Sequence, residues 1–349
     1  MTDTLTDPSS GAAPRAASPL AECEPRASSA LEAILAAVAF TVAVAAGFGP
    51  WSPLWDLPGM RSVAPVAMLF ALLVGAYLAS SVSDVTRALH AWVRRHARYH
   101  VGALTGPGVL WIVVVLYSAL SGLAVLSRAV AFGAYLVAPA LLVAGRTTPS
   151  GRPPVRELAA IAVLWLPIEF RLLPPLPVPA PVGYDAARVV GLVDALFLFL
   201  VARPLSRVGY TFALGRRDVA VAVVAFLTYA AVALPVGLAT GFIAWWPRVN
   251  GGSVLLTPLL IYVAIAVPEE LLFRGLVQNL LTRWCGPARA LALAAVVFGL
   301  AHLPDLRYVL LATAAGVAYG WVYQRTGRIT AAAVTHTLVD AVWVTLLHR

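Results

Sequence analysis

The sequence predicts an all-α fold: a polytopic integral membrane helix bundle with about 8–11 transmembrane helices. Its 349 residues are 60% hydrophobic and only 12% charged, whereas soluble domains are about 25% charged. Apolar runs follow one another along almost the whole chain. The arginines fall mainly between these runs, as they do in the loops of membrane proteins.

The apolar runs define the expected helices. They lie at about 31–49, 62–82, 107–127, 129–145, 158–173, 189–202, 219–246, 253–281, 290–304, 308–323 and 329–347. Two of them, 158–173 and 189–202, are short for a crossing, because a transmembrane helix needs about 20 residues.

Three regions follow from this pattern. Residues 1–29 are rich in Ala, Ser, Pro and Thr and lack apolar periodicity, which predicts a disordered cytoplasmic tail. Residues 30–216 form an N-terminal transmembrane region to which the sequence assigns no role. Residues 217–349 form a second region, which contains most of the ionisable residues found inside apolar runs.

The arginines predict how the chain crosses the membrane. They group in the expected loops as Arg87, Arg94, Arg95 and Arg98; Arg146, Arg152 and Arg156; Arg203, Arg207, Arg216 and Arg217; Arg283 and Arg289; and Arg325 and Arg328. If every apolar run crosses, all these loops lie on one side, which the positive-inside rule makes cytoplasmic. We expect a multi-pass protein of a bacterial inner membrane with a cytoplasmic N-terminus.

The net charge of +9 does not predict nucleic-acid binding, because the arginines are not gathered on one face. The expected partners are membrane lipid and a membrane-associated protein or peptide substrate. In the segment HAWVRRHARYH, His96 and His100 are four residues apart, as in some metal sites. The neighbouring Arg94 and Arg95 instead favour a basic interfacial segment that faces anionic lipid.

Ionisable residues inside the apolar runs are concentrated near the C-terminus. They are Glu269, Glu270, Arg274, His302, His336 and Asp340. A charge at the bilayer centre costs about 2.5–3.5 kcal/mol on insertion scales, so such residues face a protein interior or a water-filled cavity. A functional role is therefore the default hypothesis.

Spacing suggests how these residues meet. Glu270 and Arg274 are four residues apart on a helix and can pair, and Glu269 points about 100° away from Glu270. At about 1.5 Å per residue, Glu269 lies roughly 21 Å from Arg283, which follows its run on the expected cytoplasmic side. The histidines reach comparable depths on two other helices, and Pro268 should kink the first helix. Carboxylates and histidines placed in this way suit acid–base chemistry on a water molecule.

Three motifs carry a resemblance to a known family. EELLFR (Glu269–Arg274), FGLAH (Phe298–His302) and HTLVD (His336–Asp340) fit the patterns EExxxR, FxxxH and HxxxN/D. Their order and separation resemble the CPBP intramembrane proteases, the family of CAAX prenyl endopeptidases and bacteriocin-processing or immunity proteins. The resemblance covers roughly residues 217–347.

The resemblance implies an endopeptidase that hydrolyses a peptide bond of a membrane-associated or lipid-anchored substrate within the membrane. Glu269 and His302 would hold and activate the water, and Glu270 with Arg274 would orient the glutamate pair.

His336 and Asp340 would stabilise the oxyanion by the same resemblance. Many members have Asn at the last position, and an ionised Asp340 cannot donate a hydrogen bond. Asp340 would therefore be protonated, orient His336 or bind a cation.

Alternatives stay open from the sequence. Glu269, His302, His336 and Asp340 could form a zinc site; the absence of HExxH favours a metal-free glutamate mechanism without a cofactor. The polar residues could instead form a structural network in a catalytically silent immunity or scaffold protein. A proton-coupled transporter is a further alternative, although it would predict repeats that the sequence does not show.

Overall fold

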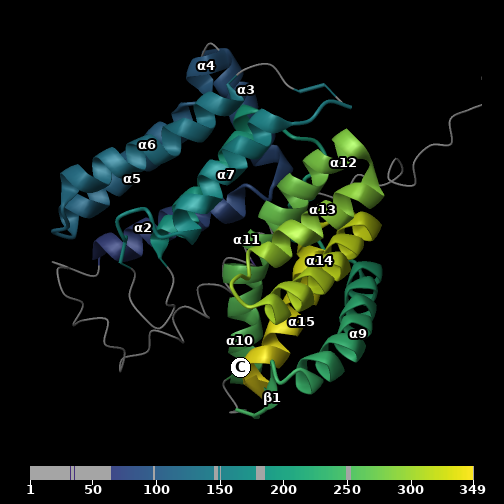
Figure 1. Ribbon diagram of the computed structural model, residues 1–349. Coiled ribbons are helices and arrows are strands. Elements are labelled where there is room, and N and C mark those ends of the chain that lie inside the picture. The colour runs from purple at the N-terminus through teal and green to yellow at the C-terminus, as the bar shows by residue number, and fades with distance from the viewer. Residues whose placement is uncertain are drawn as a thin grey trace, which may run out of the picture.

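The computed structural model describes residues 32, 35, 64–96, 99–144, 148–149, 151–177, 185–248 and 253–348. This part of the chain is an all-α bundle with one short two-stranded ribbon (Figure 1). The predicted tail and the first apolar run lie outside the described residues, apart from Glu32 and Leu35. The expected fold class is confirmed.

The N-terminal helices are α2 (Ala64–Ala79), α3 (Ser83–His96), α4 (Tyr99–Gly102), α5 (Thr105–Leu120), α6 (Val125–Val143), α7 (Val155–Glu169) and α8 (Ala186–Leu196), which continues as the π-helical segment η3 (Phe197–Ala202). They overlap the predicted runs, except α3 and α4, which lie between the runs 62–82 and 107–127.

The C-terminal helices also match their runs. They are α9 (Arg216–Ala239), α10 (Ser253–Ile261), η4 (Tyr262–Ala266), α11 (Val267–Glu270), η5 (Leu271–Gln278), α12 (Asn279–Cys285), α13 (Pro287–Leu300), α14 (Leu306–Thr326) and α15 (Ile329–Leu346). From α10 to α12 the helical chain is continuous, with π-helical segments on both sides of α11. Such wide turns often occur at functional sites, and here they flank the proline and the two glutamates.

Four helical stretches of the described part are long and apolar enough to cross a membrane. They are Val125–Val143, Arg216–Ala239, Leu256–Cys285 and Ile329–Leu346, and Thr105–Leu120 and Pro287–Leu300 are shorter apolar helices. These segments indicate an integral membrane protein. The larger number of about 8–11 crossings stays a prediction.

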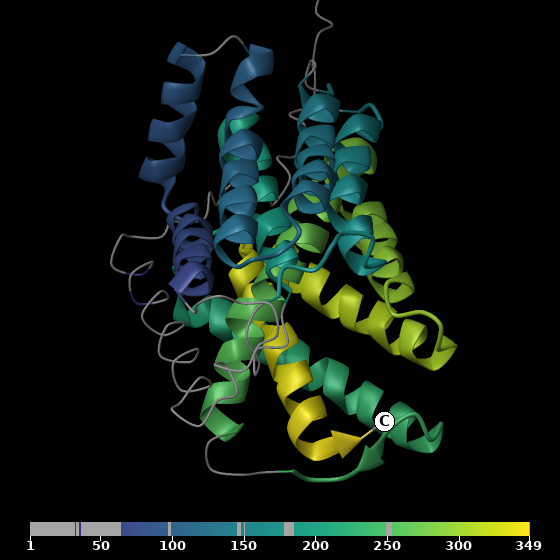
Figure 2. The same cartoon turned by 90° about the vertical axis from the view of Figure 1, so that its left-hand side faces the viewer.

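Two expectations about local structure are wrong. The basic segment predicted as a loop forms the amphipathic helix α3 between Ser83 and His96. The run 219–246 does not stay helical, because α9 ends at Ala239 and Gly241 has φ +62°, a conformation that suits glycine after a helix end. Beyond this turn the chain forms β1 (Ala244–Trp245), which pairs antiparallel with β2 (Leu347–His348) at the lower edge of Figure 2.

The arginine-bearing connections after α6, η3, α12 and α14 meet at one end of the bundle, which we call the arginine-rich end. The Gly151 amide donates to the Arg283 carbonyl over 3.1 Å, and Arg283 bonds to the Ser206 hydroxyl. At the same end, Arg328 pairs with Asp218 at 3.2 Å. This arrangement agrees with the expectation that these loops share one side.

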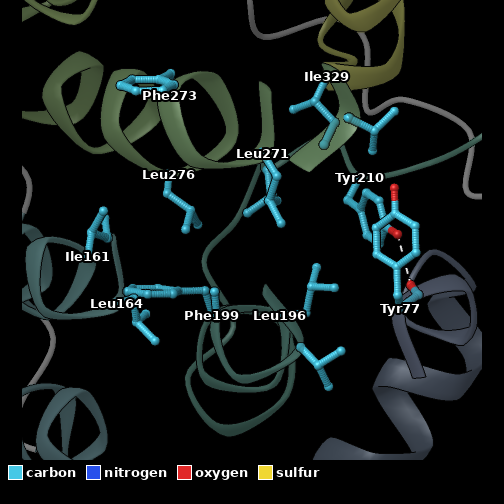
Figure 3. Close-up of a cluster of buried hydrophobic side chains, with 14 of the residues drawn as sticks. Tyr77, Ile161, Leu164, Leu196, Phe199, Tyr210, Leu271, Phe273, Leu276 and Ile329 are labelled. Carbon is cyan, nitrogen blue, oxygen red and sulfur yellow. Dashed lines mark hydrogen bonds between the residues drawn. The ribbon is translucent and has the colours of Figure 1, made fainter. Parts of the chain in front are cut away.

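One hydrophobic core joins the N-terminal and C-terminal helices. Figure 3 shows Leu271 and Leu276 of η5 facing Leu164 of α7 and Phe199 of η3. The T-shaped ring pair of Trp165 and Phe273, with centroids 5.2 Å apart, lies in the same contact. The predicted division near residue 217 falls in the first turn of α9, and the helices on its two sides pack together.

Gly316 and Gly320 form a GxxxG motif in α14, where this helix packs closely on α13. A Cβ on Gly316 would lie 2.9 Å from the Ala295 Cα of α13, and a Cβ on Gly320 would lie 2.4 Å from Leu291 Cδ1. Real Cβ atoms do not come this close to backbone, so Gly316 allows the two helices to approach.

Gly316→Ala should lower the free energy of unfolding by about 1–3 kcal/mol, because the helices must separate to admit the methyl group. The matched control is Gly75→Ala on α2, whose added Cβ would meet nothing within 4 Å. Both changes bring the same gain in helix propensity. The difference between the two free energies of unfolding, measured at equilibrium in mixed micelles, therefore reports the clash at Gly316 alone. Equal stability of the two variants would contradict the close contact.

Candidate active site

The site is built around a fully buried ion pair. Arg274 Nη1 lies 2.9 Å from Glu270 Oε1, and both side chains are 0% exposed. The helical spacing of four residues brings them together along α11 and η5. A buried charge without a partner is strongly unfavourable, so each residue fixes the position of the other.

Arg274 is held by more than its glutamate. Its Nη2 donates to the Gly316 carbonyl over 3.1 Å, and its Cζ lies 4.6 Å from the Phe298 ring centroid and 5.1 Å from that of Tyr319. The glycine that lets α14 approach therefore also supplies a backbone acceptor to the guanidinium. Gln278 repeats the pattern one turn further on, since its Nε2 donates to the Gly320 carbonyl over 3.1 Å.

The same buried glutamate positions His336 of α15. His336 Nδ1 lies 2.9 Å from Glu270 Oε1. A carboxylate only accepts hydrogen bonds, so Nδ1 carries the proton when Glu270 is ionised. Tyr319 stacks on the imidazole, with centroids 4.7 Å apart and planes 17° apart. The hydrogen bond to Glu270 and the stacking on Tyr319 together hold the imidazole ring of His336 in one orientation.

The other ring nitrogen of His336 faces two more accessible acids. His336 Nε2 lies 3.4 Å from Asp340 Oδ2 and 3.8 Å from Glu269 Oε2. The side chains of Glu269 and Asp340 are 37% and 33% exposed, whereas that of His336 is 5% exposed. The two adjacent glutamates thus have different surroundings: Glu270 is enclosed by protein, and Glu269 is open.

His302 lies just beyond the last turn of α13. Its Nδ1 is 2.8 Å from the Phe298 carbonyl oxygen, which is the bond expected of a purely structural histidine. That bond places the proton on Nδ1 and leaves Nε2 with a free lone pair in the neutral ring. Phe298 links the two histidines, with ring centroids 4.9 Å from His302 and 5.9 Å from His336.

Glu269 and His302 line the same cavity of about 570 Å³. Both side chains are therefore open to a water molecule or a peptide group that enters this cavity. The structure therefore gathers all six residues singled out in the sequence, five in one network of polar contacts and His302 beside them.

Glu269, His302, His336 and Asp340 do not form a ready-made zinc site in this arrangement. Within the described residues, no group of three or more His, Cys, Asp or Glu side chains is placed to hold a metal ion. The donor geometry gives the zinc alternative no support, and the metal-free mechanism stays a prediction.

Sequence reasoning overlooked two residues of the network. Tyr319 lies in an apolar run with no motif to mark it, but it is 1% exposed and stacks on His336. Gln278 was not singled out, although it follows Arg274 by one helical turn within the same apolar run. The signal in the sequence was a repeated spacing: Gln278 follows Arg274 by four residues, as Gly320 follows Gly316.

Taken together, fold and site define an integral membrane helix bundle with a buried Glu–Arg–His network beside a cavity. Residues 251–342 match the family described as type II CAAX prenyl endopeptidase Rce1-like. This match confirms the resemblance to the CPBP proteases, over a shorter stretch than expected, since α9 lies outside it. No curated protein and no solved structure matches the chain.

Arg274→Met should lower the free energy of unfolding by about 3–5 kcal/mol, because it leaves a buried carboxylate without its partner. The double variant Glu270→Gln/Arg274→Met should recover much of this loss, because it removes both charges. Denaturant titration in micelles measures both. If the double variant were less stable than Arg274→Met alone, the ion pair would not be the dominant interaction.

Proposed function

We propose that the protein is a glutamate-type intramembrane endopeptidase that cleaves a membrane-associated or lipid-anchored substrate. The similarity to a protease family supports peptidase chemistry in general. The observation that carries the finer proposal is the contrast between Glu269, which opens onto a cavity with His302, and Glu270, which is buried with Arg274. We further propose a bacterial inner membrane and a cytoplasmic N-terminus.

Glu269 is the general base in this mechanism. A water held between Glu269 and His302 Nε2 gives a proton to the Glu269 carboxylate as its oxygen attacks the peptide carbonyl carbon. The new C–O bond produces a tetrahedral intermediate with a negatively charged oxygen. Glu269 then returns the proton to the peptide nitrogen as the C–N bond breaks, which releases an amine and a carboxylic acid, and the acid passes its proton to the amine to give a carboxylate and an ammonium group.

His336 is the electrostatic partner of the oxyanion. Its Nδ1–H is directed to Glu270, so Nε2 can also donate only when the ring is an imidazolium. Asp340, at 3.4 Å from Nε2, lies where it can orient this donor. Of the possible roles for Asp340, orientation of His336 is the one that the distance supports best. Preorganised donors of this kind typically contribute about 10²–10³ in turnover.

Glu269→Gln should abolish turnover and leave the protein folded and inserted, because glutamine is nearly isosteric but cannot accept the proton from water. The test compares the termini of membrane and secreted proteins from cells with wild type, Glu269→Gln or the remote control Asp84→Asn. Asp84 lies on α3 with its side chain 81% exposed. We expect processed termini with wild type and Asp84→Asn only.

Equal processing by Glu269→Gln and wild type would exclude the general-base role. Wild type, Glu269→Gln and Asp84→Asn could also give the same protein termini at equal expression. In that case the silent scaffold or the proton-coupled transporter would replace the protease proposal.

Asp340→Asn should keep activity within about tenfold of wild type, because asparagine can accept from His336 and can also donate to the oxyanion. Asp340→Leu, of similar size but without polar atoms, should lose about 10²–10³ in turnover. Cleavage rates at matched expression test the pair. Full activity of Asp340→Leu would contradict a role for this side chain.

A further inference from the structure

The helices α9 and α14 lie side by side at the edge of the bundle, away from α7 and α8 (Figure 1). At the arginine-rich end, Asp218 of α9 pairs with Arg328, which follows α14, at 3.2 Å. At the other end, Arg307 Nη1 of α14 donates to the Thr240 carbonyl after α9 over 3.3 Å. The two helices are therefore antiparallel neighbours from end to end. α9 precedes residue 251, where the family match begins.

A groove of about 510 Å³ runs between these two helices. This volume is within the range of about 300–1,000 Å³ for ligand sites. Thr228 and Tyr229 are the polar residues of the lining, and their hydroxyls donate to backbone carbonyls. Small side chains from both helices leave the space open: Ala225, Ala233, Ala314 and Ala318. The groove is therefore apolar.

The groove faces the surroundings of the bundle. In the described part of the chain, α9 is the most exposed candidate membrane span: 11% of its most apolar stretch is buried, compared with 33–44% in the other three. Val224 and Val232, which line the groove, are 55% and 62% exposed. Along α14 the groove extends from Leu311 to Trp321, about 15 Å. One leaflet contributes about half of the 30 Å hydrocarbon core, so the groove has the length of an acyl chain.

Two arginines lie at one end of this groove, one on each helix. Arg325 follows Trp321 by one turn, and its Cζ is 5.2 Å from the centroid of the Trp321 indole. Arg217 precedes Val224 by seven residues and so lies on the same face of α9. Both arginine side chains are exposed. Arg325 is about 6 Å and Arg217 about 10 Å beyond the groove, toward the arginine-rich end.

We propose that this groove, named here the α9–α14 lipid site, binds one anionic phospholipid from the leaflet at the arginine-rich end. One acyl chain lies along the alanines, and the phosphate lies between Arg217 and Arg325. Guanidinium groups bind phosphate oxygens in bidentate geometry, and basic sites between membrane helices bind anionic headgroups. A zwitterionic headgroup brings a cation toward the same arginines and binds less well. The site does not depend on peptidase activity.

The test measures lipid binding to the purified full-length protein in detergent micelles. The micelles are titrated with phosphatidylglycerol or with phosphatidylcholine of the same acyl chains, and native mass spectrometry counts the bound lipids. Wild type should bind one phosphatidylglycerol at least tenfold more tightly than phosphatidylcholine. Arg217→Gln/Arg325→Gln should lose this preference. The matched control is Arg152→Gln/Arg156→Gln, which removes two exposed arginines from the same end of the bundle and should keep it.

A second pair of variants tests the groove itself. Ala318→Phe places a ring where the acyl chain lies and should weaken phosphatidylglycerol binding at least tenfold, whereas Ala318→Ser leaves the groove open and should bind as wild type does. If Ala318→Phe unfolds, Ala318→Leu takes its place with a smaller loss, and unchanged binding to folded Ala318→Leu contradicts the groove.

Three outcomes would overturn the α9–α14 lipid site. The first is equal binding of the two lipids by wild type. The second is wild-type affinity for phosphatidylglycerol in either the arginine variant or Ala318→Phe. The third is a wild-type dimer that Ala318→Phe converts to a monomer, because a second copy of the chain would then cover the groove.

Discussion

The buried pair of Glu270 and Arg274 is the interaction on which the rest of the site depends. Both side chains are fully enclosed, and a buried charge that loses its partner is strongly destabilising. The pair therefore specifies one arrangement of three helices: η5 provides the arginine, α14 a carbonyl to bind it, and α15 a histidine that binds the same glutamate. Helices that separated or slid would break at least one of these bonds.

This constraint explains why two neighbouring glutamates can do different work. Glu270 faces the packed interior, and its position is fixed by Arg274 and His336. The helical turn of about 100° per residue then directs Glu269 into the cavity, with its side chain 37% exposed. The Arg274 guanidinium holds the Glu270 carboxylate in place, and the Glu269 carboxylate is left accessible to water and substrate. The approach of α14 at Gly316 is part of the same arrangement, because a side chain there would push away the carbonyl that binds Arg274.

The sequence predicted most of the helices because apolar runs are a strong local signal. The six residues that it singled out lie together in the structure, and their roles stay a prediction. Most apolar runs placed their helices to within a few residues, although α5 and α9 end seven residues before their runs do. Charges inside such runs are rare enough to stand out.

The sequence missed what depends on packing: the ribbon of β1 and β2, the stacking of Tyr319 on His336, and the groove between α9 and α14. An aromatic residue has the same appearance in a sequence whether it faces lipid or an imidazole. Only the fold shows that Ala225 of α9 and Ala318 of α14 line one groove.

The central claim is that side chains of this chain activate water for peptide-bond hydrolysis, and isotope incorporation tests it most directly. Purified wild type in nanodiscs, incubated with a peptide library in ¹⁸O-labelled water, should release products whose new C-terminal carboxyl carries one labelled oxygen. The label should be absent with Glu269→Gln and should persist after treatment of the wild type with a metal chelator. Loss of labelled product on chelation would contradict the metal-free mechanism. No labelled product from folded wild type would contradict the hydrolytic function itself.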